Sequence, residues 1–325
     1  MKRFISFTLA ILLLTPVLAG CKQTGNRADI GSDNKISVVA TIFAPYDFVR
    51  EIAGDNADIT MLLPPASESH SFEPTPQDVI KIQNCDVFIH VGGESDKWVG
   101  EILSPMDTGK MKIVTLMDCV DVVEEEIVEG MEEEDEHDHE DEGGNHEDEP
   151  EYDEHVWTSP KNAKLIVQRI SDALCEADQA NADLYKQNTS DYLGKLDELD
   201  TAFGMVVETA ARKTIVFGDR FPFRYFADTY GLDYFAAFPG CSTEMEPSAA
   251  TIAFLIDKVN EENIPVIFHA ELSNGKMAGT ISEATGAKVL LLHACHNISK
   301  DDFQNGVSYL ELMTRNVDAL KEAIQ

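Results

Sequence analysis

The chain has 325 residues, of which 43% are hydrophobic and 26% are charged, so it is long enough for two globular cores of ordinary size. Its formal net charge is −34, from 59 acidic and 25 basic residues. Residues 124–154 hold 19 of those acids with no Lys or Arg, and the other 40 acids still outnumber the 25 bases. This excess argues against nucleic acid or an anionic membrane surface as a partner of the folded body.

The first twenty residues form a targeting segment rather than part of the fold. Lys2 and Arg3 precede an apolar run at 5–14 that is too short to span a bilayer, and Leu18-Ala19-Gly20-Cys21 follows. This order is typical of a bacterial lipoprotein signal, in which Cys21 is lipidated and becomes the new N-terminus. The alternative is an ordinary secretory peptide with an incidental cysteine. With lipidation, the mature protein is anchored outside the cell membrane.

Short β-rich runs alternate with helical patterns along the body of the chain, which favours an α/β fold with parallel sheets flanked by helices. We expect strands at 36–42, 59–63, 87–91, 112–116, 214–217, 266–268 and 288–292. We expect helices at 46–53, 76–83, 98–103, 182–211, 222–230, 274–285 and 306–324, and others opening at Ser159-Pro160 and at Glu246-Pro247-Ser248.

The helix expected at 182–211 would be roughly 40 Å long, more than one small lobe requires. We interpret it as the connector between two lobes. A solvent-exposed coiled-coil arm that forms a dimer is the rival interpretation, but its heptad pattern is short. The expected organisation is a signal peptide at 1–20, a tether at 21–35, a first lobe at 36–160 that contains an acidic insert at 120–154, helices at 161–211, and a second lobe at 212–325.

Five cysteines remain after Cys21, and their spacing matches no zinc-ribbon pattern: Cys85, Cys119, Cys175, Cys241 and Cys295. An odd number in an exported protein leaves at least one thiol free. Most of them fit small buried apolar positions. Cys241 and Cys295 could form a disulfide, but the sequence alone does not establish this pair.

Several potential metal ligands fall where a strand is expected to end and a helix to begin, which is where ligands bind in parallel α/β sheets. His70 lies in a loop with three prolines, and His155 directly precedes the helix start at Ser159-Pro160. Asp219 and His293 follow two expected strands of the second half, and His293 is close to Cys295 and His296. The acidic insert adds three more imidazoles, which we interpret as an accessory metal loop: His137, His139 and His146.

Two motifs in these regions resemble one family. Pro64-Pro65, four residues, then His70-Ser71-Phe72-Glu73-Pro74-Thr75-Pro76 is the first, and Asp153-Glu154-His155-Val156-Trp157 leading to Pro160-Lys161-Asn162-Ala163 is the second. Together they are similar to the zinc- and manganese-binding lipoprotein receptors of ABC importers. The resemblance covers about 36–325. It implies two α/β lobes joined by a rigid helix, with a metal held in the cleft between them.

Carried over by position, the resemblance makes His70 and His155 the two first-lobe ligands, and His293 a second-lobe ligand. The family usually has His or Glu where this chain has Gly218, which is a departure. Either Asp219 or a nearby acid such as Glu271 substitutes, or water completes the site; His296 is a further candidate. Three imidazoles suit Zn²⁺ better than Mn²⁺, which prefers more carboxylate oxygen.

The function implied is a monomeric extracytoplasmic zinc receptor, not an enzyme, that delivers Zn²⁺ to a membrane permease powered by an ATPase. A surface lipoprotein that buffers metal or acts in cell adhesion is the alternative. A zinc hydrolase is a further alternative, because three protein ligands plus water is the catalytic pattern. Against it, the sequence has no His-Glu-x-x-His helix.

Overall fold

The computed structural model describes residues 35–67, 72–131, 151–242 and 247–325. Five of the candidate lipidation and metal-binding residues named above lie outside the described residues, and what was expected of them stays a prediction: Cys21, His70, His137, His139 and His146. Lys35–Gln325 forms one compact unit, which is the part described below.

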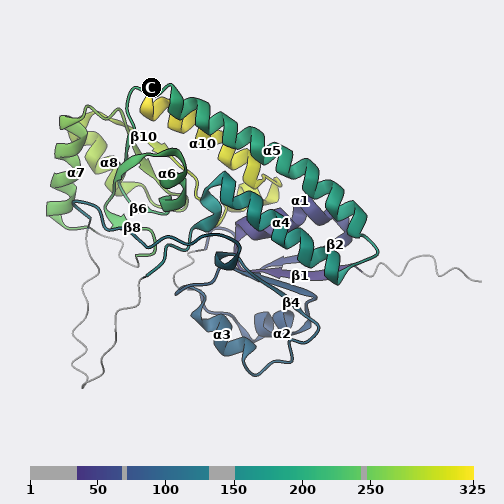
Figure 1. Ribbon diagram of the computed structural model, residues 1–325. Helices are drawn as coiled ribbons and strands as arrows, with labels where there is room; N and C mark the ends of the chain where they lie inside the picture. The colour runs from purple at the N-terminus through teal and green to yellow at the C-terminus, as the bar shows by residue number, and fades with distance from the viewer. Residues whose placement is uncertain (1–34, 68–71, 132–150, 243–246) are drawn as a thin grey trace, which may run out of the picture. The chain divides into compact units, whose positions relative to one another are not determined.

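The first half of this unit is a four-stranded parallel sheet in the order β2-β1-β3-β4 (Figure 1). Its strands are β1 (Ile36–Ala40), β2 (Ala57–Met61), β3 (Val87–His90) and β4 (Lys112–Thr115). The helices α1 (Phe43–Ala53), α2 (Pro76–Asn84) and α3 (Lys97–Leu103) follow β1, β2 and β3 in the chain. Val38 and Val87 are fully buried, as expected for a parallel sheet covered on both faces.

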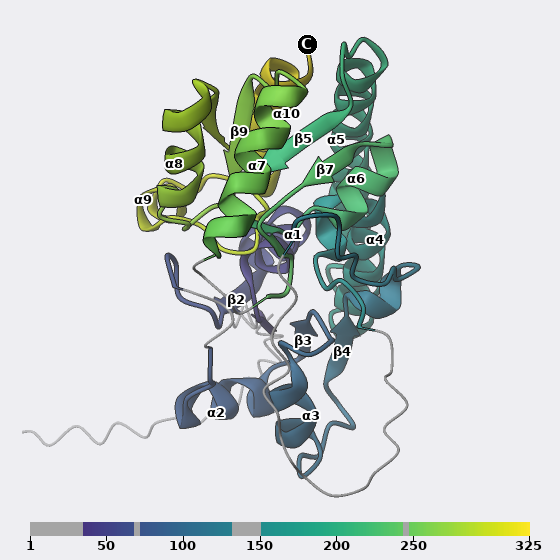
Figure 2. The same ribbon diagram turned by 90° about the vertical axis from the view of Figure 1, so that its left-hand side faces the viewer.

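The second half repeats this arrangement with a parallel sheet in the order β10-β9-β5-β7. Figure 2 shows β9, β5 and β7 of this sheet. Its strands are β5 (Thr214–Phe217), β7 (Asp233–Phe235), β9 (Val266–His269) and β10 (Lys288–Leu291). The associated helices are α6 (Arg224–Tyr230), α7 (Ala249–Glu261), α8 (Lys276–Thr285), α9 (Lys300–Gln304) and α10 (Tyr309–Ile324). Two strands of two residues each, β6 (Arg220–Phe221) and β8 (Phe238–Pro239), pair with each other in a separate small sheet. Both lie between β5 and β9 in the sequence. The predicted α/β class is confirmed, whereas β7 and the β6–β8 pair were not predicted.

Two long helices, α4 (Pro160–Ala177) and α5 (Ala182–Glu208), connect the halves (Figure 1). α4 contacts β3 and β4 of the first sheet, and α10 contacts β5, β9 and β10 of the second. α5 packs against α4, α1 and α10, so it is held by helices of both halves. It buries a stripe at alternating spacings of four and three residues: Tyr185, Thr189, Tyr192, Leu196, Leu199 and Phe203. Because α5 packs against α1, α4 and α10 of the same chain, it is a connecting helix and not an exposed coiled-coil arm.

The two halves bury many of their apolar side chains together. The largest cluster of buried apolar side chains contains Val38 of β1, Ile215 of β5, Leu196 of α5 and Leu312 of α10. Helices that contact both halves continue the apolar cluster from one sheet to the other. Burial of each such side chain contributes about 1.5–3 kcal/mol to folding. The two halves therefore share one principal core, with smaller clusters beside it.

Two further expectations can be compared with the described residues. Cys241 and Cys295 are both free, as are the other three described cysteines, so the pairing left open above is not made. Within the described ranges, we find no helix with the length and apolar character needed to cross a membrane.

Candidate metal site

His155 lies at the junction between the two halves, with an exposed fraction of 2%. Its backbone N–H donates to Asp153 Oδ1 at 2.8 Å, and its ring nitrogen Nδ1 lies 3.3 Å from the same oxygen. A short 3-10 turn, Val156–Thr158, follows directly and leads into α4. Asp153 thus fixes the orientation of the imidazole, as carboxylates commonly do for metal-binding histidines.

The helix start after His155 agrees with the sequence prediction in position but not in its cap. Ser159 is the N-cap residue of α4 and Pro160 is the first helical residue, yet the Ser159 side chain makes no capping bond. Its hydroxyl is instead 2.8 Å from the hydroxyl of Thr229, which precedes the last residue of α6. The bond ties this part of the chain to the second half.

Glu271, after β9, organises the loop that contains His293 and His296. Its carboxylate accepts hydrogen bonds from the backbone N–H of Ala294 at 2.7 Å and of His296 at 2.8 Å. The indole N–H of Trp157 donates to the Ala294 carbonyl at 2.7 Å. These bonds place the imidazole ring of His296 5.6 Å from that of His155, measured between centroids.

The proline loop that leads to His70 is hydrogen-bonded to the loop that contains His296. The Asn297 side-chain amide donates to the carbonyls of Pro64 at 2.9 Å and Ser67 at 2.7 Å. Ser67 is the last described residue before the gap that contains His70. The contacts bring the first-half proline loop to the second-half loop of His296.

These elements enclose a small pocket of about 60 Å³. Its lining includes Ser67, His155, Arg220, Gly240, Glu271 and His296. An ion with a few water molecules fits such a volume, since a cavity of about 10–15 Å³ on this measure holds one water molecule. Imidazole and carboxylate donors from both halves therefore meet at one site of the right size for a metal ion.

The two second-half residues first expected to be ligands lie elsewhere. His293 is buried behind the loop, and its ring nitrogen Nδ1 accepts a hydrogen bond from the backbone N–H of Cys295 at 3.0 Å. The backbone N–H of His293 donates to Asn316 Oδ1. Asp219 faces a larger neighbouring cavity of about 330 Å³. Of the described candidates, His155, His296 and Glu271 line the small pocket, while His293 and Asp219 do not.

Packing explains why the chain has glycine at position 218. A Cβ atom added there would lie 2.7 Å from Cα of Ala278 in α8, closer than two carbon atoms can approach. Backbone of a helix cannot yield as a flexible side chain can. With Ala278 this close, position 218 has no room for a side chain in this protein, and the second half must supply its donors from other loops.

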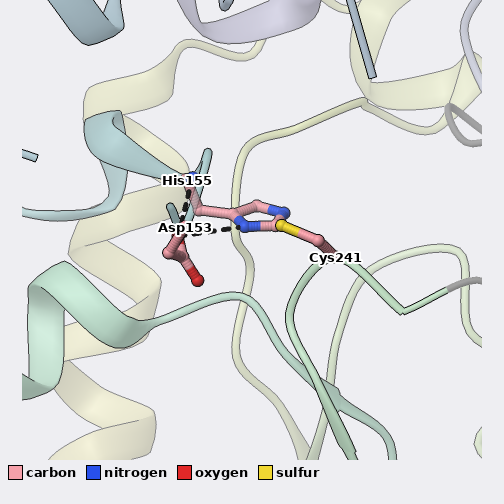
Figure 3. Close-up of side chains that lie close together, drawn as sticks. All are labelled: Asp153, His155 and Cys241. Carbon is pink, nitrogen blue, oxygen red and sulfur yellow. Dashed lines mark hydrogen bonds and ion pairs between the residues drawn. The ribbon is translucent and has the colours of Figure 1, made fainter. Parts of the chain in front are cut away.

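Sequence reasoning missed one group of donors beside His155. Ligand atoms of Asp153, His155 and Cys241 all lie within 4.8 Å of one another (Figure 3). Asp153 could have been found, since an acid two residues before a candidate ligand can reach the same site. Cys241 carried no such signal, because the spacing of the cysteines matches no zinc-ribbon pattern.

Burial and negative charge shift several pKa values here. Burial alone would lower the pKa of His155, but the Asp153 carboxylate and its hydrogen bond, then Glu154 and Glu125, outweigh burial and raise it. Burial raises the pKa of the Cys241 thiol, and the charges of Asp153 and Glu125 raise it further. Burial also raises the pKa of Glu125 and of Glu154. The surroundings of His155 thus favour a bound cation.

Two parallel sheets held by a long shared helix, with a buried pocket of imidazole and carboxylate groups where their loops meet, define a two-lobed α/β metal-binding protein. The model of one family, described as "Zinc-uptake complex component A periplasmic", matches residues 38–323. The chain belongs to this family, which confirms the family resemblance drawn from the sequence.

Individual relatives agree with this assignment. The high-affinity zinc uptake system protein ZnuA of Bacillus subtilis is 33% identical over 98% of this chain and 96% of its own length. The zinc-binding lipoprotein AdcA of Streptococcus pneumoniae is 33% identical over 90% of this chain, which spans 56% of that longer protein. The Zn(II)-bound ZnuA-like domain of AdcA superimposes with a TM-score of 0.72 at 29% identity, covering 89% of this chain and 99% of that domain.

Proposed function

We propose that this protein is an extracytoplasmic, high-affinity Zn²⁺ receptor that delivers the ion to an ABC import permease and its ATPase. The observation that carries the proposal is the buried His155 imidazole, oriented by Asp153, at a pocket that both halves line. The family match over 38–323 supports the same function. Membership of a metal-transport family favours a binding protein over an enzyme.

For the ligands, we propose His155 and His70 from the first half, with His296 from the second. The Pro64 and Ser67 carbonyls that Asn297 binds support a place for His70 near the pocket. Glu271 positions His296 through the backbone, and its carboxylate also borders the pocket. Imidazole nitrogen donors favour Zn²⁺ over Mn²⁺.

The remaining parts of the proposal rest on sequence and on relatives. Lipidation at Cys21 would anchor a monomeric receptor to the outer face of the cell membrane, beside its permease. The relative AdcA is described as a zinc-binding lipoprotein, which supports this placement. The imidazoles of the insert, His137, His139 and His146, would concentrate Zn²⁺ weakly beside the tight site.

Calorimetric titration of the intact protein and of a variant with 132–150 replaced by a short Gly-Ser linker tests both roles. We expect one tight Zn²⁺ site in both proteins, at least about a hundredfold tighter than for Mn²⁺. Further weak sites should occur in the intact protein alone. The linker variant keeps Asp153, and with it the hydrogen bond to His155.

Two results would count against these proposals. Absence of a tight Zn²⁺ site in the intact protein would refute the receptor. Loss of the tight site in the linker variant, with an unchanged circular dichroism spectrum, would show that the insert holds the ion itself.

A further inference from the structure

The sulfur of Cys241, which is not among the residues that line the pocket, is one corner of a triangle of donor atoms. Its other corners are on Asp153 and His155, and no two of the three ligand atoms are more than 4.8 Å apart (Figure 3). Asp153 and His155 precede α4, whereas Cys241 follows β8 in the second half. Nitrogen, oxygen and sulfur donors from distant parts of the chain thus converge at one place.

Glycine at position 240 is what lets the Cys241 loop come this close. A Cβ atom added to Gly240 would lie 3.0 Å from Asp153 Oδ2 and 3.2 Å from His155 Nδ1. It would also lie 2.9 Å from the backbone oxygen of Phe221, which cannot give way like a side chain. Gly240 also lines the pocket, so the triangle and the pocket adjoin.

Each donor is held in place by contacts outside the triangle. The Cys241 backbone N–H donates to Glu125 Oε1 at 2.9 Å. The Tyr225 hydroxyl donates to the Asp153 carbonyl at 2.7 Å. Asp153 has an exposed fraction of 1%, and among the described residues its ion-pair partner is His155 rather than a Lys or Arg. A buried carboxylate with such a partner is well suited to a bound cation.

The spacing is close to that of a zinc site. Zn–N bonds are about 2.0–2.1 Å and Zn–S bonds about 2.3 Å, so two such donors on one tetrahedral ion stand roughly 3.3–3.6 Å apart. The observed upper limit of 4.8 Å needs a movement of only about 1 Å to reach that range. Rotation of the Cys241 side chain can supply a movement of this size.

We propose that Cys241 is a metal ligand of this receptor, and that its thiolate binds the same Zn²⁺ ion as the His155 imidazole, whose orientation Asp153 holds. The inference rests on the proposed function and names donors for its site. On binding, the thiol S–H bond breaks, its proton passes to solvent, and the sulfur electron pair forms the Zn–S bond without any change of oxidation state. If His155 is protonated, its ring proton also leaves.

Sulfur at the site has a consequence for selectivity. Thiolate is a soft donor that binds Zn²⁺ and other thiophilic ions well, while Mn²⁺ prefers carboxylate, carbonyl and water oxygen. Cys241 should therefore strengthen binding of Zn²⁺ and have little effect on Mn²⁺. A merely structural cysteine would not discriminate between the two ions.

Cobalt spectroscopy tests the Zn–S bond without any substitution. Co²⁺ occupies zinc sites and gives a thiolate-to-metal charge-transfer band in the near ultraviolet when sulfur is a ligand. We expect this band at one equivalent of Co²⁺ in the unmodified protein, and its absence in Cys241→Ser. The Zn²⁺ affinity of that variant should fall at least about tenfold, with the Mn²⁺ affinity changed less than about threefold.

Cys119→Ser is the matched control, because Cys119 is also a partly buried free thiol and its sulfur donates to the Thr115 carbonyl instead. It should keep the band. Stoichiometric, tight metal binding without the band would overturn the ligand proposal and leave the receptor intact. Persistence of the band in Cys241→Ser would also overturn it. Failure of the unmodified protein to bind Zn²⁺ or Co²⁺ tightly would refute both proposals.

Discussion

His155→Ala lowers the Zn²⁺ affinity by more than about a hundredfold in this account. Changing a residue that only orients a ligand costs about 10–100-fold in metal affinity, and removing the ligand itself should cost more. His155 has an exposed fraction of 2%, lines the pocket and is one corner of the donor triangle. Competition titration against a chromogenic zinc chelator measures the effect.

The control for this variant is His90→Ala. His90 is a half-buried imidazole at the end of β3, where it stacks on Phe88 at 5.4 Å between centroids and lies 3.2 Å from the Thr115 hydroxyl. Its removal should alter packing without altering metal binding. Equal affinity of His155→Ala and the unmodified protein, with both folded by circular dichroism, would refute the assigned role of His155.

The second large effect is on the pH dependence of binding. Against the opposing effect of burial, Asp153, Glu154 and Glu125 raise the pKa of His155 above its ordinary value of about 6.5. A raised pKa means that the metal-free protein keeps the ring proton to higher pH, so Zn²⁺ must displace it. Affinity should fall as pH decreases from above about 6.5, by about tenfold per pH unit for each proton displaced.

Calorimetry at pH 6 in two buffers of different ionisation enthalpy counts the released protons. We expect at least one proton per Zn²⁺ bound. Affinity that stays constant between pH 7.5 and 5.5, with no proton released, would show that neither His155 nor any other protonated group is displaced.

Much of the fold could be predicted from local patterns. The strands observed at Val87–His90 and Thr214–Phe217 agree with the prediction to within one residue, because each is a buried apolar run bounded by polar residues. The helix observed at Ala182–Glu208 was predicted as 182–211, since its apolar stripe continues across almost its whole length. The principal core that both halves share could not be predicted, because it depends on which faces of α5 and α10 pack together.

Local sequence patterns did not identify which of two neighbouring histidines borders the pocket. His293 and His296 are three residues apart, and sequence alone favoured His293 because it directly follows a predicted strand. Between them Cys295 adopts φ of 60°, a left-handed conformation that is uncommon outside glycine. Together with the hydrogen bonds to Glu271, it directs the loop so that His296 borders the pocket and His293 packs behind it.

Cys241 depends on features that are still less local. It follows β8, a two-residue strand whose pairing with β6 has no periodic signal in the sequence. Its approach to His155 also requires a residue without a side chain at 240. A long-range contact of this kind becomes visible only in three dimensions.

The central claim is that one Zn²⁺ ion binds at His155, where loops of both halves meet. Diffraction from crystals of the zinc-loaded protein, collected on both sides of the zinc absorption edge, tests it most directly. We predict one strong anomalous peak within about 2.0–2.1 Å of a His155 ring nitrogen, with Cys241 Sγ about 2.3 Å from the same ion. A fully occupied zinc peak elsewhere, with His155 still bonded to Asp153 and no ion beside it, would contradict the account.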